Sequence, residues 1–359
     1  MRIVYAANYG FKDCGLYYYT SALKFQQGLI TNGHFVYPFS LNDMERLFSP
    51  LGHRTLGRPG VNRALLETCR NIEPDILFLI HGNSIYPKTL GEIHKAVPHI
   101  KIIYFWGDGI WEGMPTERLH KKLPYVDGAF INTGGDWLLP YAGPGRMLCY
   151  IPHVVEATVD RGRAFEATET DYDLIFFGRD VPARNTLLKT IKAKLPHLRF
   201  GFFGCLSSPL VYGIEKEKIT VRSKMALNLT RRNDILLSSS DRLADTTANG
   251  VMTFCDEASG LQLLYRENEA VYYRDLDDLI QKIRYYHEHD DERIRIARAG
   301  WKRSQEDFSA QRIARFMVDA TFRNGNYMDI PWPRFILDNG KKVCWDGHLI
   351  PDSKSAKTR

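Results

Sequence analysis

Apolar positions along the chain form two patterns, continuous runs and runs at helical spacing. Residues 2–7, 76–80 and 101–106 are largely apolar runs, which are typical of strands buried on both faces of a parallel sheet. Residues 16–32 place Leu23, Gln27 and Ile30 at turn spacing and are predicted to be a helix. The alternation of strands and helices predicts an α/β fold.

The order of elements at the start of the chain occurs again in its second half. A strand, a glycine-containing loop, a helix and a second strand are predicted over residues 2–38 and again over 173–204. The charged, Thr-rich segment 155–170 lacks any period and is predicted to link two domains. We therefore expect two Rossmann-like domains that face each other across a cleft. Their glycines do not match Gly-x-Gly-x-x-Gly, so a dinucleotide cofactor is not expected.

The remaining segments set the expected boundaries of the domains. Residues 41–60 have the glycine and proline content of a loop, and 275–288, 292–305 and 309–322 are predicted helices. Asn339-Gly340 between apolar alternations predicts a β-hairpin, and 352–359 are expected to be disordered. The expected domains are 1–155, 156–325 and an extension at 326–359 that carries the hairpin.

Polar side chains follow several predicted strands of the first domain. Ligands bind outside the carboxyl ends of strands in open parallel sheets, so these side chains are candidates to line a cleft. The candidates are His81, Asn83, Asp108, Asp136 and His153. Asp108, between two glycines, is the first candidate for a general base, and the alternative is a loop carboxylate that caps the next helix. A histidine at a strand end can equally be a structural residue.

The segment 239–265 is the most informative stretch of the second domain. Ser239 and Ser240 can cap a helix, and Arg242 and Asp245 would share one face of it. Gly250 suits the left-handed residue that ends a helix, and 261–265 is expected to open the next one. A carboxylate, a guanidinium and unpaired backbone amides can together bind a nucleoside diphosphate. The alternative is an ordinary helix and strand with a surface ion pair.

Composition and charge limit the class of protein and the kinds of partner that it can bind. The 359 residues are 44% apolar and 25% charged, which fits a two-domain globular protein. A net charge of +6 permits anionic partners, and the spread of basic residues without a recognition motif argues against nucleic acid. The six cysteines form no Cys-x-x-Cys pair, which indicates a reducing compartment without structural zinc. Neither a signal peptide nor an apolar run of about 20 residues is present, so we expect a cytoplasmic protein.

Several motifs between about residues 50 and 320 together resemble those of one protein family. In the second half of the chain they are at 176–179, 242–251, 260–261, 272–275, 290–293 and 297–300. In the first half they are at 52–54, 74–75, 82 and 105–108. The first set resembles the donor-binding half of the GT-B glycosyltransferases, and the second set resembles their N-terminal half. The sequence is most similar to the CgeB-like group with its "glycosyl transferases group 1" C-terminal domain.

The resemblance implies that the second domain binds a nucleotide sugar and the first an acceptor. It places Asp245 on the donor ribose, Gly178 and Arg179 near the diphosphate, and Arg184 near the leaving phosphate. It also places the amides of Gly260 and Leu261 at the phosphates or sugar. Arg242 either contacts phosphate or pairs with Asp245.

The sequence departs from the family at one position. Retaining relatives often carry a glutamate eight residues before the ribose-binding one, where this chain has Leu237. The carboxylate that contacts the sugar is then absent or supplied by Asp256 or Glu257. Retention and inversion of configuration both stay open.

The predicted activity is transfer of a sugar from a nucleotide-sugar donor to a hydroxyl of a bacterial surface glycan, a lipid-linked acceptor or a protein. Arg179 and Arg184 would stabilise the leaving group without a metal, since no suitable Asp-x-Asp loop occurs, and Asp108 would be the base. The expected acceptor residues are Gly10, Tyr17, His81, Asn83, Asp108 and His153. Tyr17 belongs to a run of three tyrosines that is mostly expected to pack.

Two other functions fit the same residues. One is a nucleotide-sugar epimerase on the same fold, and the other a non-catalytic relative that binds a glycan or partner. Basic residues near 222–232 and in the predicted helix near 293–303 make peripheral contact with an acidic inner membrane face a further expectation.

Overall fold

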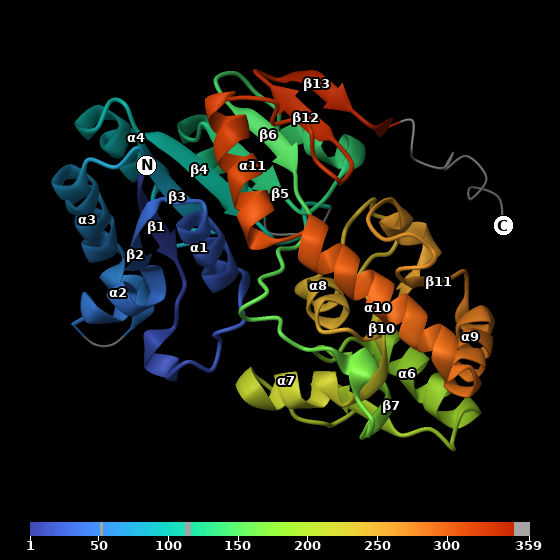
Figure 1. The fold of residues 1–359 in the computed structure, drawn as a ribbon. Helices are drawn as coiled ribbons and strands as arrows, with labels where there is room; N and C mark the ends of the chain where they lie inside the picture. Colours follow the sequence, from blue (N-terminus) through green and yellow to red (C-terminus); the bar gives the residue numbers. More distant parts are fainter. Residues whose placement is uncertain (51–52, 112–115, 348–359) are drawn as a thin grey trace. The chain divides into compact units, whose positions relative to one another are not determined.

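The computed structural model describes residues 1–50, 53–111 and 116–347, and its chain divides into two compact units (Figure 1). Unit 1 comprises Met1–Gly15, Ala22–Pro152 and Ala310–Arg359, and unit 2 comprises Leu16–Ser21 and His153–Ser309. Two parts of the sequence predictions lie outside the described residues: the segment 352–359, which is expected to be disordered, and the motif residue Gly52.

Unit 1 is built on an eight-stranded sheet in the order β13-β12-β6-β5-β4-β3-β1-β2. Six strands are parallel: β1 (Arg2–Ala7), β2 (Phe35–Ser40), β3 (Ile76–Ile80), β4 (Lys101–Trp106), β5 (Gly128–Ile131) and β6 (Met147–Tyr150). Every residue of β3 is buried, as the continuous apolar run predicts for a strand with both faces covered.

The predicted hairpin is confirmed and extends this sheet. β12 (Phe335–Asp338) pairs antiparallel with β6 and with β13 (Lys341–Trp345). Asn339 and Gly340 between them have φ of 51° and 77°. Two successive left-handed residues are what a two-residue turn requires, and Asn-Gly adopts them at the lowest cost.

Helices cover the sheet of unit 1. They are α1 (Ser21–Thr31), α2 (Leu41–Leu47), α3 (Arg54–Ile72), α4 (Pro87–Ala96), α5 (Glu117–Lys122) and α11 (Ala310–Phe322). Short 3-10 helices lie at η1 (Phe11–Asp13), η2 (Leu123–Tyr125) and η3 (Gly135–Tyr141). α11 packs on β4 and β5. It therefore groups with unit 1, whereas the sequence assigned its residues to the second domain.

Two predictions in unit 1, one of a loop and one of the start of a helix, were wrong. Residues 41–60 are not a loop, because α2 and the start of α3 lie there. The glycines that suggested a loop allow these helices to touch: a Cβ on Gly57 would overlap the carbonyl of Glu45, and one on Gly60 would lie 2.5 Å from the Cβ of Phe48. The helix expected over 16–32 begins only at Ser21, because residues 16–20 pack in unit 2.

Unit 2 is built on a five-stranded parallel sheet in the order β11-β10-β9-β7-β8. The strands are β7 (Tyr172–Phe177), β8 (Phe200–Phe203), β9 (Ser223–Asn228), β10 (Met252–Asp256) and β11 (Val271–Tyr273). Alternate residues of β7 enter two apolar clusters, Leu174 and Phe176 in the larger one and Ile175 and Phe177 in the smaller. Both faces of the sheet are therefore covered.

The helices of unit 2 follow the predicted pattern with one correction. They are α6 (Pro182–Lys194), α7 (Gly213–Val221), α8 (Asp241–Ala248), α9 (Leu276–Glu288) and α10 (Asp290–Asp307), with 3-10 turns η4 (Ala164–Glu166), η5 (Glu257–Ser259) and η6 (Leu261–Leu263). Residues 261–265 form only η6 and not the opening of an α-helix. Side chains explain the stop, since Arg303 donates to the carbonyl of Leu264 and Tyr272 to that of Tyr265.

Candidate functional site

Arg242 lies at the carboxyl ends of two neighbouring strands of unit 2. Its Nη1 donates to the carbonyl of Phe177 at 3.0 Å, and its Nη2 to that of Leu229 at 2.6 Å. The guanidinium also lies 5.0 Å from the centre of the Phe176 ring. Arg242 therefore ties the end of β7 to the end of β9, and no ion pair with Asp245 is among its observed contacts.

Positive charge gathers around Arg242. Burial lowers its pKa to about 10, and the nearby Arg184 guanidinium acts in the same direction. Burial lowers the pKa of Arg184 as well, and there the Arg231 guanidinium contributes. Within the described residues, neither Arg184 nor Arg231 forms an ion pair with a carboxylate. Such a cluster favours an anionic ligand.

Two buried atoms of this arginine cluster (Arg184, Arg231 and Arg242) have no hydrogen-bond partner. They are the Nε atoms of Arg184 and Arg242. Native structures leave few buried polar atoms unpaired, so phosphate oxygens are suitable partners for these donors. Gly178 packs tightly beside the cluster, where a Cβ would lie 2.5 Å from the Phe176 ring and 3.4 Å from Nη1 of Arg242. Arg179, which follows it, is exposed.

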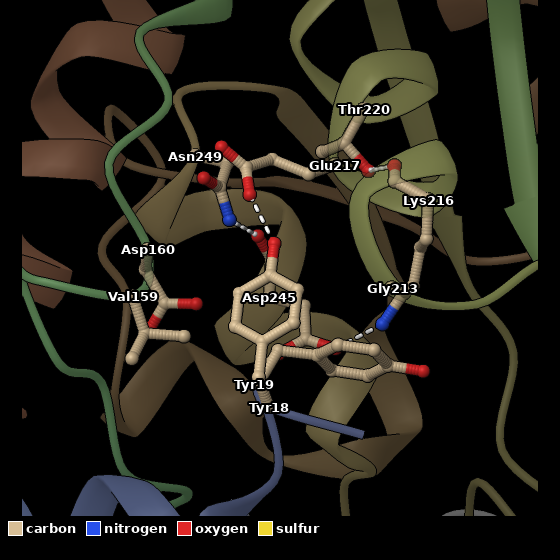
Figure 2. A pocket seen from close by; sticks show the side chains of 10 residues that line it. All are labelled: Tyr18, Tyr19, Val159, Asp160, Gly213, Lys216, Glu217, Thr220, Asp245 and Asn249. Carbon is tan, nitrogen blue, oxygen red and sulfur yellow. Dashed lines mark hydrogen bonds and ion pairs between the residues drawn. The ribbon is translucent and has the colours of Figure 1, made fainter. Parts of the chain in front are cut away.

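Asp245 is buried in α8 and is paired with a residue that the sequence did not single out. Its Oδ2 lies 2.5 Å from Nζ of Lys216, which comes from α7. Figure 2 shows the Lys216 side chain reaching down to this carboxylate, with the rings of Tyr18 and Tyr19 beside it. A small pocket of about 30 Å³ adjoins the pair.

The start of α8 differs from the expectation in one respect. Ser240 is the residue before the helix, but its hydroxyl makes no capping bond and is buried without a hydrogen-bond partner. Asp241 follows and pairs with His153, whose Nδ1 is 2.6 Å from Oδ1 of Asp241. His153 is only 8% exposed, and its Nε2 has no hydrogen-bond partner.

Gly260 and Leu261 form a turn against the loop that carries Leu237. Gly260 has φ of 67°, and a Cβ there would lie 2.5 Å from Leu236. Leu261 is fully buried, and the amide of Gly260 donates to the carbonyl of Glu257 at 3.3 Å. Leu237 is also fully buried, and its amide donates to the carbonyl of Ser259 at 2.9 Å.

Of the two carboxylates that could replace a glutamate at 237, Asp256 lies nearer the sheet. It ends β10, accepts from the amide of Ala258 at 2.9 Å and from Nδ2 of Asn233 at 2.8 Å. Burial raises its pKa despite these hydrogen bonds. Glu257 is exposed.

Four of the predicted acceptor residues lie at strand ends of unit 1. His81 follows β3 with φ of 54°, and its Nδ1 is 3.6 Å from Oδ2 of Asp108, which follows β4. The Asp108 side chain is 60% exposed, and Asn83 is exposed too. Gly10 follows β1, the strand next to β3, and its amide donates to Asn42 at 3.3 Å.

The other two predicted acceptor residues belong to unit 2. Tyr17 packs edge-on against Tyr212, with ring centres 5.4 Å apart. His153 pairs with α8 as described above. The structure therefore groups His81, Asn83, Asp108 and Gly10 in one unit and Tyr17 and His153 in the other.

Lys216, Tyr18 and Tyr19 are the site residues that the sequence did not identify. Lys216 lies in the run Glu215-Lys216-Glu217-Lys218, which looks like a solvated helix face. Only the packing of α7 shows that Lys216 points inward while Lys218 stays exposed.

Residues 1–50, 53–111 and 116–347 contain no group of three or more His, Cys, Asp or Glu side chains placed to bind a metal ion. No helix in the same part of the chain has both the length and the apolar character needed to cross a bilayer.

Comparisons with known proteins agree with this architecture. Residues 184–319 match a protein family described as glycosyl transferase-like. No curated protein sequence matches the chain significantly.

Solved structures share the fold at low identity. Sucrose-phosphate synthase from Thermosynechococcus elongatus has a TM-score of 0.59 at 11% identity, over 90% of this chain and 98% of that one. The catalytic domain of starch synthase IV from Arabidopsis thaliana, bound to ADP and acarbose, scores 0.61 at 10% identity, over 90% and 99%. HepE from Anabaena, in complex with UDP, scores 0.54 at 11% identity, over 90% and 100%.

These matches confirm the predicted two-domain α/β fold, and the narrower CgeB-like assignment stays a prediction. The chain therefore shares the GT-B fold of these solved structures, and its residues 184–319 are similar to the glycosyl transferase-like family.

Proposed function

We propose that the protein transfers a sugar from a nucleotide-sugar donor, bound by unit 2, to a hydroxyl of a glycan, a lipid-linked sugar or a protein. The observation that carries this proposal is the arginine cluster, which contacts the carboxyl ends of β7 and β9 through Arg242 and forms no ion pair with a carboxylate among the described residues. Open parallel sheets bind their ligands at such ends. The solved relatives support the donor class, since HepE is seen with UDP and UDP-glucose, and starch synthase IV with ADP.

The cluster suits the chemistry of the leaving group. Breaking the bond from sugar to diphosphate places negative charge on the phosphate oxygens, and preorganised cations stabilise that charge. Arg184, with its unpaired Nε, and the exposed Arg179 are the proposed contacts to phosphate. Arg242 positions the strand ends. We propose that these groups serve in place of a metal ion.

Asp245 is the proposed ligand of the donor ribose, and Gly260 and Leu261 are the proposed contacts to the phosphates or sugar. For the acceptor we propose the strand ends of unit 1, with Gly10, His81, Asn83 and Asp108. The proposed role of Asp108 is to take a proton from a hydroxyl or to orient it, which is supported by its exposed side chain and by the 3.6 Å from its Oδ2 to Nδ1 of His81. Tyr17 and His153 complete the proposed acceptor set from unit 2. We propose a cytoplasmic site of action, with any membrane contact peripheral.

The test compares two substitutions on α6. Arg184→Gln removes a cation of the cluster, whereas Lys192→Gln removes an exposed cation from the same helix. We expect Arg184→Gln to weaken nucleoside-diphosphate binding about 10-fold or more, since a charged hydrogen bond is lost, and to reduce sugar transfer. Lys192→Gln should match the wild type. The measurements are a thermal-shift panel of nucleoside diphosphates and a transfer assay with nucleotide sugars.

Three outcomes would change the proposal. A wild-type protein that binds no nucleoside diphosphate and transfers no sugar would overturn it. Binding without any turnover would favour a non-catalytic relative, which agrees with the buried Leu237 in place of a carboxylate. Release of an altered free sugar without an acceptor would favour the epimerase.

A further inference from the structure

The small pocket beside Asp245 belongs entirely to unit 2 and has a mixed polar and aromatic lining (Figure 2). Tyr18 and Tyr19 reach it from the segment Leu16–Ser21, Lys216 and Glu217 from α7, and Asp245 from α8. The proposed function uses Asp245 alone. The rest of this lining decides which part of a ligand can enter.

The ammonium group of Lys216 has more N–H donors than observed acceptors. Its side chain is 15% exposed, and its ammonium donates to Oδ2 of Asp245 at 2.5 Å. An ammonium carries three N–H donors, and this is its one observed hydrogen bond within the described residues. The Tyr19 ring, with its centre 4.4 Å from Nζ, covers another side of the ammonium without accepting a conventional hydrogen bond.

Other polar groups of the pocket are fixed by their own contacts. The hydroxyl of Tyr18 donates to the carboxylate of Glu217. Nδ2 of Asn249 donates to the backbone carbonyl of Asp245 at 2.8 Å, which holds the last turn of α8 in place. The Lys216–Asp245 pair is thus a donor and an acceptor side by side in a preformed frame.

The Lys216–Asp245 pair is chemically suited to bind two adjacent hydroxyls. Each hydroxyl both donates and accepts, so a vicinal diol can donate to a carboxylate and accept from an ammonium at once. The pocket measures about 30 Å³, and a water-sized group needs roughly 10–15 Å³, so two hydroxyls fit while a sugar ring stays at the mouth. A phosphate does not suit the pocket, because Asp160, Glu217 and Asp245 line it with negative charge.

We propose that Lys216 and Asp245 together bind the 2′,3′-diol of the donor ribose, so that Lys216 selects ribonucleotides over 2′-deoxyribonucleotides. The inference rests on the proposed function and adds a specificity-determining residue to it. Tyr19 keeps the ammonium beside the carboxylate and limits the entry of water.

The test measures the affinity of the preferred nucleoside diphosphate and of its 2′-deoxy counterpart by calorimetric titration. The wild type is expected to bind the ribonucleotide about 10-fold more tightly, since one hydrogen bond to a charged group is lost with the 2′-hydroxyl. Lys216→Met is expected to lower ribonucleotide affinity and bring this ratio close to 1. Lys218→Met, on the exposed side of α7, is the matched control and should keep the wild-type ratio.

Lys216→Arg provides a second variant that keeps the charge facing Asp245. Its larger, planar head changes the geometry, so an intermediate ratio is expected, and this variant carries the test if Lys216→Met does not fold. Equal wild-type affinity for the two nucleotides, or an unchanged ratio in a folded Lys216 variant, would overturn this inference and leave the proposed function standing. A wild type that binds neither nucleotide would overturn both.

Discussion

At the residue scale, Arg242 shows how one side chain can organise a site without being its obvious ligand. It donates to the carbonyl of Phe177, which ends β7, and to that of Leu229, which directly follows β9, and it packs on the Phe176 ring. At the carboxyl end of a parallel strand, the last carbonyls have no N–H of a neighbouring strand left to accept from. A forked guanidinium can satisfy two of them at once, and an ammonium has no such geometry.

Arg242→Lys is therefore expected to destabilise unit 2 although it keeps the positive charge. Loss of at least one of the two buried hydrogen bonds should lower the free energy of unfolding by ~1–3 kcal/mol. Urea unfolding followed by circular dichroism measures this change. Arg295→Lys, at an exposed position of α10, is the control and should leave stability within ~0.5 kcal/mol. Equal loss in both variants would contradict the bridging role.

At the element scale, the C-terminal hairpin is joined to α11 by a bidentate ion pair. Arg323, just beyond α11, donates from Nε to Oδ2 of Asp338 at 2.8 Å and from Nη2 to Oδ1 at 2.5 Å. Asp338 ends β12, the strand that pairs with β6. The ion pair therefore holds two late segments of the chain together at one edge of the unit 1 sheet.

Asp338→Asn gives a pH-dependent prediction. The hydrogen bonds from Arg323 hold the pKa of Asp338 below its ordinary value of 3.8. A lowered carboxylate pKa contributes stability that is present above 3.8 and is lost as the pH falls through the folded value. The variant should thus be less stable by ~0.5–1 kcal/mol at pH 7, and the difference should shrink below about pH 4.

The measurement is urea unfolding of both proteins across pH 7 to 3. Glu92→Gln, at an exposed position of α4, is the control and should show no such trend. A difference between wild type and Asp338→Asn that grows as the pH falls would have the wrong sign for this ion pair.

At the scale of the whole molecule, the chain leaves unit 1 after Pro152 and returns to it at Ala310. The returning helix α11 packs on β4 and β5 (Figure 1). Phe316 at its centre is 3% exposed, and its ring contacts those of Phe130 and Trp332. Unit 1 is therefore complete only when the last part of the chain has been added.

Phe316→Ala should accordingly destabilise unit 1 and leave unit 2 unaffected. Removing a buried aromatic ring costs ~3–5 kcal/mol, and each unit has its own core. Hydrogen exchange read by mass spectrometry should show lost protection in β3, β4 and β5 and unchanged protection in β7, β9 and β10. Gln311→Ala, exposed on the same helix, is the control. Lost protection mainly in the strands of unit 2 would contradict this assignment of α11.

Local patterns of sequence predicted much of this fold. The continuous apolar run at 76–80 gave β3 without error, because a strand covered on both faces needs apolar side chains at every position. Asn339-Gly340 gave the hairpin turn, and Gly250, with φ of 77°, gave the end of α8. Each of these features depends on the conformation of a few neighbouring residues, so the sequence by itself determined it.

Contacts between distant segments were decided only by the tertiary structure. Asp245 and Lys216 lie 29 residues apart on two helices, and nothing in either segment shows that α7 turns Lys216 inward. The same holds for the carbonyls that bind Arg242 and for the sheet that α11 covers. Helical periodicity shows which side chains share a face, whereas the partner of that face is set by the packing of whole elements. The sequence therefore determined the elements, and the tertiary structure decided which charges meet at the site.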